Sequence, residues 1–250
     1  MALCELKYFS LALGKATAAN VILPERQPGP FPVLYLLHGL SDDYSIWQRR
    51  TNIERYLHGL PLIVVMPDGG RGFYCDALQG FAYETAMVRD LVEFIDNTFN
   101  TRAQRGGRAL AGLSMGGYGA VKLALQYPEK FCCALSHSGA MAFGHKSMPD
   151  EDPRADEFRR IVGKDAGGGP NDMFVLSQQL EAANRPALRI DCGTEDFLLE
   201  DNRDFHAHLE KIGYAHEYQE FPGGHTWDYW DEHVREAIAF CARHLEIETN

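Results

Sequence analysis

Short runs that are apolar at every position constrain the fold of this chain more than any other feature. Val33–Leu37 and Leu62–Met66 are such runs, and the second stops at Pro67-Asp-Gly-Gly. A strand that is apolar on both faces must be covered on both, which is typical of parallel sheets packed between helices. A helical pattern follows at Glu84–Asn97. The alternation predicts an α/β fold, with a mainly parallel sheet and helices on both faces.

The rest of the chain continues this alternation, with one interruption. Residues 141–186 carry Pro and Gly clusters and show no strand pattern. A segment this long between strands is more often a functional cap than a plain loop, although a mobile surface excursion is the alternative. We therefore expect one domain over residues 1–250, with 141–186 as a cap or lid-like insertion. The remaining predicted strands are Leu6–Phe9, Ala19–Leu23, Arg108–Leu113, Cys132–Leu135, Ala187–Cys192 and His216–Phe221, and the remaining predicted helices are 116–126, 201–212 and a C-terminal helix over 230–245.

Composition limits the partners that the chain can have. Apolar residues make up 45% of 250 residues, and the net charge of −11 disfavours nucleic acid or an anionic membrane as partner. A small anionic substrate stays open, because one pocket can differ from the mean. The N-terminus does not resemble a signal peptide, and no apolar run is long enough to span a bilayer. Six cysteines without C-x-x-C spacing predict buried free thiols and a cytoplasmic protein, rather than disulfides or a zinc site.

One motif predicts a nucleophile. Gly112-Leu-Ser114-Met-Gly116 fits G-x-S-x-G between a predicted strand and a predicted helix. That context is the one a nucleophile elbow requires, where a strained turn presents the serine. An ordinary glycine-rich turn is the alternative, and a P-loop is not, because G-K-[ST] is absent. We expect Ser114 to attack an acyl carbon.

Two backbone amides are expected to bind the oxyanion that such an attack creates. The elbow places the Met115 N–H beside the serine. The loop His38-Gly39-Leu40 follows a buried strand, and its Leu40 N–H is the second candidate donor. We expect His38 to brace this loop by hydrogen bonds rather than to act as a base.

The base and the acid follow from chain order, which in α/β-hydrolases runs serine, acid, histidine. His225 lies in Pro222-Gly-Gly-His225, directly after the last predicted strand, where a loop can present its imidazole to the serine. The preceding strand ends at Gly193-Thr-Glu195-Asp196, so two carboxylates compete for the role of acid. We favour Asp196 as the acceptor of the His225 Nδ1–H bond and keep Glu195 as the alternative.

Taken together, these segments resemble the esterase D/S-formylglutathione hydrolase superfamily, and its tributyrin-esterase-like branch in particular. The resemblance covers nearly the whole chain and implies an α/β-hydrolase that is a cofactor-free and metal-free carboxylesterase for short acyl esters. It implies the same triad, Ser114, Asp196 and His225, and the same oxyanion donors. The matching stretches are Leu36–Leu40 with Trp47, Ile63–Asp68, Gly112–Gly119, Cys192–Leu198 and Pro222–Trp230.

The resemblance leaves the substrate open. Relatives usually carry Trp where this chain has Phe73, which puts the pocket shape in doubt. We expect substrate contacts from Gly39, Trp47, Phe73, Tyr74 and Trp227. A small acyl ester or thioester is the expected partner. S-formylglutathione, feruloyl esters and acetylated carbohydrates are alternatives, whereas acyl transfer to an alcohol and non-enzymatic binding are less supported. Exposed sheet edges of such folds often pair, so a homo-oligomer is a further expectation.

Overall fold

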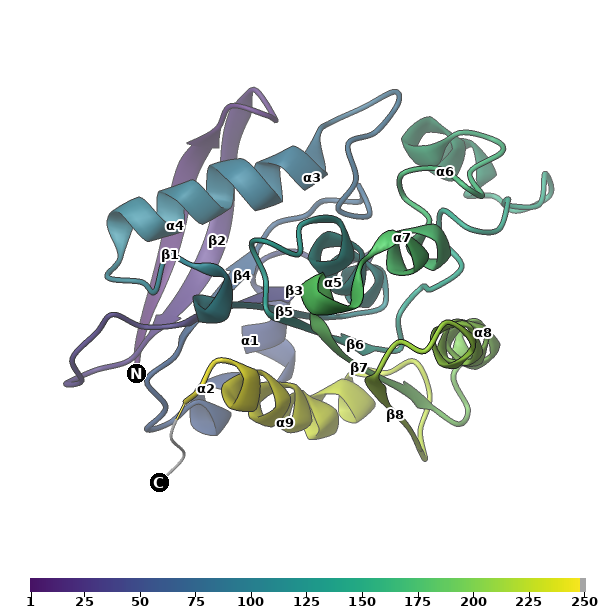
Figure 1. The fold of residues 1–250 in the computed structure, drawn as a ribbon. Coiled ribbons are helices and arrows are strands. Elements are labelled where there is room, and N and C mark those ends of the chain that lie inside the picture. Colours follow the sequence, from purple (N-terminus) through teal and green to yellow (C-terminus); the bar gives the residue numbers. More distant parts are fainter. Residues whose placement is uncertain (248–250) are drawn as a thin grey trace.

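The computed structural model describes residues 1–247, which are built around one eight-stranded sheet (Figure 1). Its spatial order is β1-β2-β4-β3-β5-β6-β7-β8. β1 pairs with β2, and β2 with β4, in antiparallel fashion, and every pair from β4 to β8 is parallel. The predicted mainly parallel sheet is confirmed. The strands are β1 Ala2–Ser10, β2 Lys15–Leu23, β3 Val33–Leu37, β4 Ile63–Pro67, β5 Arg108–Leu113, β6 Cys133–His137, β7 Ala187–Gly193 and β8 His216–Phe221.

Helices cover both faces of the sheet, as predicted. One face is covered by α1, α2 and α9, and the other by the α3–α4 helix, α5 and α8 (Figure 1). The helices are α1 Ile46–Arg50, α2 Ile53–Tyr56, α3 Tyr83–Thr85, the π-helix η1 Ala86–Leu91, α4 Val92–Thr98, the 3-10 turn η2 Arg105–Gly107, α5 Met115–Gln126, α6 Ala155–Val162, α7 Met173–Gln179, the 3-10 turn η3 Ala182–Asn184, α8 Leu199–Lys211 and α9 Trp227–His244.

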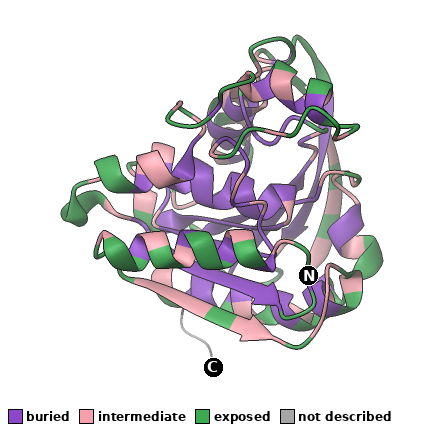
Figure 2. Cartoon of the chain, turned by 90° about the vertical axis from the view of Figure 1, so that its right-hand side faces the viewer, coloured by how far each residue is buried: buried purple, intermediate pink, exposed green. Residues whose placement is uncertain are grey.

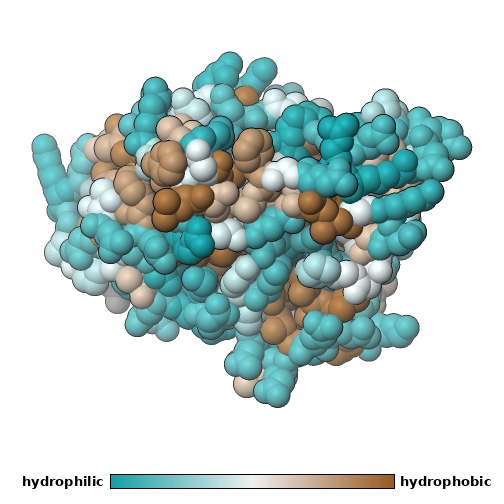
Figure 3. Space-filling view, turned by 90° about the horizontal axis from the view of Figure 1, so that it is seen from above, coloured by the Kyte–Doolittle hydropathy of each residue, from teal (hydrophilic) through white to brown (hydrophobic). Residues whose placement is uncertain are grey.

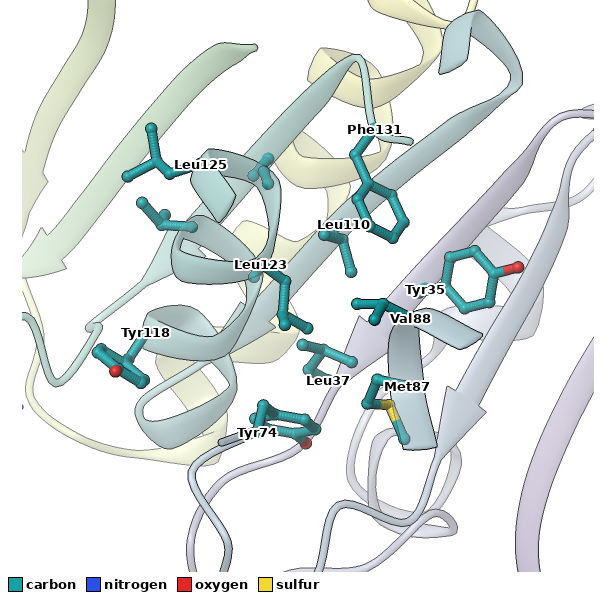
Figure 4. Close-up of a cluster of buried hydrophobic side chains, with 14 of the residues drawn as sticks. Tyr35, Leu37, Tyr74, Met87, Val88, Leu110, Tyr118, Leu123, Leu125 and Phe131 are labelled. Atoms are coloured by element: carbon teal, nitrogen blue, oxygen red, sulfur yellow. The ribbon is translucent and has the colours of Figure 1, made fainter. Parts of the chain in front are cut away.

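The strand β3 shows why its sequence is apolar throughout. Tyr35 and Leu37 point into the core that includes η1 and α5 (Figure 4), whereas Leu34 and Leu36 point into the core beneath α9. Alternate side chains of a strand face opposite sides of a sheet, so both sets must be apolar when both sides are covered. Figure 2 shows the same arrangement as a buried sheet between helices whose outer faces are exposed.

The structure differs from the sequence prediction in detail. The helix predicted over Glu84–Asn97 is present as α3, η1 and α4 in succession, with one π-helical stretch in its middle. The short helices α1 and α2 were not predicted, because four or five residues are too few to show a helical period. Residues 141–186, all of them described, contain α6, α7 and η3 and no strand, so they interrupt the strand–helix alternation as expected.

A buried ion pair fixes α5 against the segment that begins at α3. Lys122 on α5 is fully buried and contacts the carboxylate of Glu84. Glu84 also accepts a hydrogen bond of 2.6 Å from the Tyr127 hydroxyl. Since buried charges are tolerated only when paired and hydrogen-bonded, this cluster determines where α5 lies.

The structure of residues 1–247 bears on two further predictions, one about the cysteines and one about membrane-spanning helices. All six cysteines are free; Cys75, Cys133, Cys192 and Cys241 are buried, and Cys4 and Cys132 are partly so. None of the helices in this part of the chain is both long and apolar enough to cross a membrane.

Candidate active site

Ser114 lies at the turn between β5 and α5 with a backbone conformation that few non-glycine residues adopt. Its φ is +54° and its ψ is −118°. The Ser114 N–H donates to the His137 carbonyl at 2.9 Å, and its carbonyl accepts from the Ala140 N–H at 3.1 Å. Strain of this kind costs about 1–3 kcal/mol and persists only where the surroundings hold it. The turn therefore presents the hydroxyl from a fixed backbone.

Glycines make this turn possible because β3 passes very close to it. A Cβ atom on Gly112 would lie 2.4 Å from the Gly116 carbonyl oxygen, and one on Gly116 would lie 2.4 Å from the Leu37 oxygen. Both obstacles are backbone atoms, which cannot swing aside. The two glycines of the motif are thus required by packing.

The structure brings the three predicted side chains of Ser114, His225 and Asp196 into one chain of hydrogen bonds. His225 Nε2 lies 3.1 Å from Ser114 Oγ. His225 Nδ1 lies 2.9 Å from Asp196 Oδ2 and 3.1 Å from Oδ1. The Asp196 side chain is fully buried and that of His225 is 19% exposed. This is the arrangement in which an imidazole can take a proton from a hydroxyl.

The Asp196 carboxylate is held in its charged form. Burial on its own would raise the pKa of this carboxyl, but hydrogen bonds from His225 and from the Leu198 N–H outweigh burial, so the pKa lies below its usual range. The group stays ionised and can accept the Nδ1–H bond of His225.

The carboxylate of Glu195, the alternative acid, hydrogen-bonds to groups other than His225. It accepts hydrogen bonds from the Thr194 hydroxyl at 2.7 Å and from the Gly223 N–H. Gly223 is two residues before His225, so Glu195 ties down the loop that carries the imidazole without contacting it.

Of the two predicted oxyanion donors, Met115 follows Ser114 directly in the chain, and Leu40 lines the same cavity as Ser114. Among the described residues, neither the Leu40 N–H nor the Met115 N–H donates to a protein acceptor. Buried His38 braces the loop that carries Leu40. Its Nε2 accepts from the Gly69 N–H at 2.9 Å, and its Nδ1 lies 2.7 Å from the Gly39 oxygen. His38 therefore has the bracing contacts that the sequence suggested.

A cavity of about 460 Å³ is lined by Ser114. Its lining includes Leu40 and Phe73 and, from the segment 140–166, Phe143, Phe158 and Val162. Phe73 stacks on Phe143 with ring centroids 3.7 Å apart, and Phe158 meets Phe73 edge-on at 4.9 Å. Phe158 and Val162 of α6 thus give the cavity an apolar wall, to which the same helix adds the charged Arg159.

Three of the five predicted substrate contacts lie outside this cavity. Tyr74 is fully buried behind the oxyanion loop, where its hydroxyl accepts from the His38 N–H at 3.0 Å and donates to the His38 oxygen at 3.1 Å. Trp47 is 1% exposed and donates its indole N–H to the Leu37 oxygen, on the opposite face of the sheet. Trp227 packs edge-on against Trp47 at 5.4 Å. These aromatic rings support the site from behind, which their sequence positions do not reveal.

The other two predicted contacts lie close to Ser114. Phe73 lines the cavity. Gly39 has no side chain to line it, but a Cβ atom there would be 3.7 Å from Ser114 Cβ. Phe143, Phe158 and Val162 were not predicted as cavity residues, because they come from the cap segment, where the sequence shows no motif. Phe197 was not predicted either, although it lies in the matching stretch Cys192–Leu198.

The cations around the cavity are already paired. Lys146 contacts Asp201 at 2.9 Å and Asp204 at 2.8 Å. Arg154 contacts Asp152 at 3.0 Å. Arg159, the third cation in the lining, pairs with Asp150. Within residues 1–247, no group of three or more His, Cys, Asp or Glu side chains is placed to hold a metal ion.

The chain is similar to known esterases over nearly its whole length. Residues 10–241 match the family model Esterase, described as "Putative esterase". An acetyl esterase of Caldicellulosiruptor saccharolyticus is 29% identical over 264 residues, covering 97% of this chain and 99% of the relative. The fluorophosphonate-binding serine hydrolase FphF of Staphylococcus aureus superposes with a TM-score of 0.85 at 30% identity, covering 96% of this chain and 98% of that one. An S-formylglutathione hydrolase (FrmB) of Staphylococcus aureus superposes with a TM-score of 0.82 at 31% identity, with the same coverage of 96% and 98%.

The close packing at the Ser114 turn predicts that one added methyl group at Gly116 lowers the stability of the protein. A Gly116→Ala substitution places Cβ 2.4 Å from the Leu37 oxygen and 2.6 Å from the His38 oxygen. Overpacking of this kind costs about 1–3 kcal/mol of unfolding free energy, measured by urea denaturation. The matched control is Gly106→Ala, whose Cβ meets nothing within 4 Å. Equal stability of the two variants would contradict the packing described.

Proposed function

Because the chain belongs to the esterase family of α/β-hydrolases and is a carboxylic ester hydrolase, we propose that it cleaves small neutral acyl esters through an acyl-enzyme on Ser114. The predicted α/β-hydrolase fold is confirmed by its structural neighbours. The observation that carries the proposal is the hydrogen-bonded chain from Ser114 Oγ through His225 to buried Asp196.

In the first half-reaction, Ser114 Oγ attacks the ester carbonyl carbon while His225 Nε2 takes the hydroxyl proton. Asp196 accepts the Nδ1–H bond, which fixes the tautomer and stabilises the imidazolium. The oxyanion of the tetrahedral intermediate accepts hydrogen bonds from the Leu40 and Met115 amides. The imidazolium then gives its proton to the alcohol oxygen, the C–O bond breaks, and the acyl group stays on the serine.

In the second half-reaction, water replaces the alcohol. His225 Nε2 takes a proton from this water as its oxygen attacks the acyl carbon, and a second oxyanion forms at the same two amides. His225 then returns the proton to Ser114 Oγ. The carboxylic acid leaves, and the resting enzyme is restored.

The cavity supports a neutral substrate. Much of its lining is apolar, and its three cations Lys146, Arg154 and Arg159 are each paired with a carboxylate. An anionic leaving group such as the glutathione of S-formylglutathione would have to compete with those carboxylates. Residues 141–186 act as a cap in this proposal, because they supply most of the cavity wall and no reacting group.

Ser114 is tested directly by substitution. We expect Ser114→Ala to lower kcat for p-nitrophenyl acetate by on the order of 10⁵-fold, because the covalent route is lost. A fluorophosphonate probe should label the native protein at Ser114 and leave the variant unlabelled. Labelling of another residue, or full activity of Ser114→Ala, would show that the nucleophile lies elsewhere.

The two adjacent carboxylates give a matched pair of variants. Asp196→Asn should lower kcat by on the order of 10³–10⁴-fold, because the amide cannot stabilise the imidazolium. Glu195→Gln should lower kcat little, since the glutamine oxygen can still accept from the Gly223 N–H. The reverse order of losses would move the acid to Glu195.

The preference for neutral substrates is tested with thioesters that differ in charge. S-acetyl-N-acetylcysteamine and S-acetylglutathione carry the same acyl group on a neutral and on an anionic thiol. We expect kcat/KM for the neutral thioester to be about tenfold higher, which corresponds to about 1.4 kcal/mol. A preference for S-acetylglutathione, together with rapid hydrolysis of S-formylglutathione, would favour the thioesterase function instead.

A further inference from the structure

Phe197 is an aromatic side chain that is exposed to solvent and lines the cavity at Ser114. It is 74% exposed. In the view of Figure 3, apolar residues form separate patches on a largely hydrophilic surface. The other large exposed apolar side chains of the described residues are Leu3, Phe9 and Leu11 on β1 and its turn, and Leu78 and Phe81 in the loop before α3. Among these six, Phe197 alone lines the cavity at Ser114.

The backbone on either side of Phe197 is held in place. Asp196 is buried and accepts the Leu198 N–H at 2.9 Å through its carboxylate. The Leu199 N–H donates to the Asp196 carbonyl at 3.1 Å, and the Asn202 N–H donates to the Leu198 carbonyl at 3.1 Å. The turn from Asp196 into α8 is therefore fixed, and it directs the Phe197 ring to the cavity.

The ring lies on the solvent side of His225. The Phe197 and His225 ring centroids are 4.6 Å apart, with the planes tilted by 49°. Buried Trp230 meets the same imidazole edge-on at 4.8 Å. His225 thus contacts two aromatic rings, the buried Trp230 and the cavity-lining Phe197.

The chemistry of the proposed function determines which part of the substrate meets this ring. His225 Nε2 gives its proton to the alcohol oxygen, so the alcohol group lies beside His225 when the C–O bond breaks. The ring packed against His225 is then next to the alcohol group. Leu198 continues the apolar surface there, and Lys146 is neutralised by Asp201.

We propose that Phe197 is a specificity residue that binds the alcohol part of the substrate, so that the enzyme favours esters of aromatic and other apolar alcohols. This inference rests on the proposed function of Ser114 and His225. An aromatic ring offers apolar area and a favourable edge or face contact to a second ring. A small aliphatic alcohol leaves most of that surface uncovered.

The test uses phenyl acetate and ethyl acetate, which form the same acetyl-enzyme and differ only in the alcohol. We expect Phe197→Ala to reduce kcat/KM for phenyl acetate about tenfold more than for ethyl acetate. Phe197→Tyr keeps the ring and should restore the native ratio between the two substrates. Leu78→Ala is the matched control, because Leu78 is 71% exposed and lies outside the cavity lining.

The other outcomes are distinct. An equal loss of kcat/KM for both esters would mean that Phe197 positions His225 and does not select the alcohol, which overturns the inference. No loss for either ester would overturn it as well. Failure of the proposed function would be seen separately, as full activity of Ser114→Ala with either acetate.

Discussion

The rest of the site depends on the narrow passage between the Ser114 turn and the strand β3. The turn keeps an unfavourable φ of +54° because Gly112 and Gly116 let it approach the Leu37 backbone, where any side chain would collide. The same approach sets where Leu40 can lie, because β3 ends at Leu37 and the oxyanion loop begins there. The proposed nucleophile and the proposed oxyanion donors are therefore positioned by the close packing between β3 and the turn from β5 into α5.

A second segment with a strained backbone, Phe73 and Tyr74, packs against the loop that follows β3. Phe73 and Tyr74 both adopt positive φ, at +50° and +52°, which is unusual for two successive bulky residues. With this backbone conformation, the side chains of Phe73 and Tyr74 point in different directions. Phe73 turns into the cavity, while the Tyr74 hydroxyl satisfies both the N–H and the carbonyl of His38. The cavity wall and the loop that carries Leu40 are thus coupled through the turn at Phe73 and Tyr74. Backbone strain of this kind tends to occur where functional groups must be held in fixed positions.

The sequence predicts the structural features that follow from the order of residues along the chain and from hydrophobic periodicity. It does not predict features that depend on which residues lie side by side in the folded protein. Ser114, Asp196 and His225 each follow a strand, and parallel strands bring their carboxyl ends to one edge, so their proximity could be expected. Trp47 and Trp227 stand in stretches that resemble other esterases, yet they pack behind the site. Only the fold shows this, because a motif does not tell which side of a loop an aromatic ring takes.

Different parts of the chain supply the proposed reacting groups and the cavity wall. Every group proposed to react lies on a loop directly after a strand, and these loops are tied to one another, as Glu195 ties to Gly223. Most of the cavity wall comes instead from the segment 140–166. Its charged side chains pair within the segment, as Arg154 does with Asp152, or with other parts of the chain, as Lys146 does with Asp201. Substitutions in that wall can change the shape of the cavity without moving the Ser114–His225 hydrogen bond. We therefore assign the proposed chemistry to the loops at the end of the sheet, and the choice of ester to the cap and to the exposed Phe197 ring at the cavity.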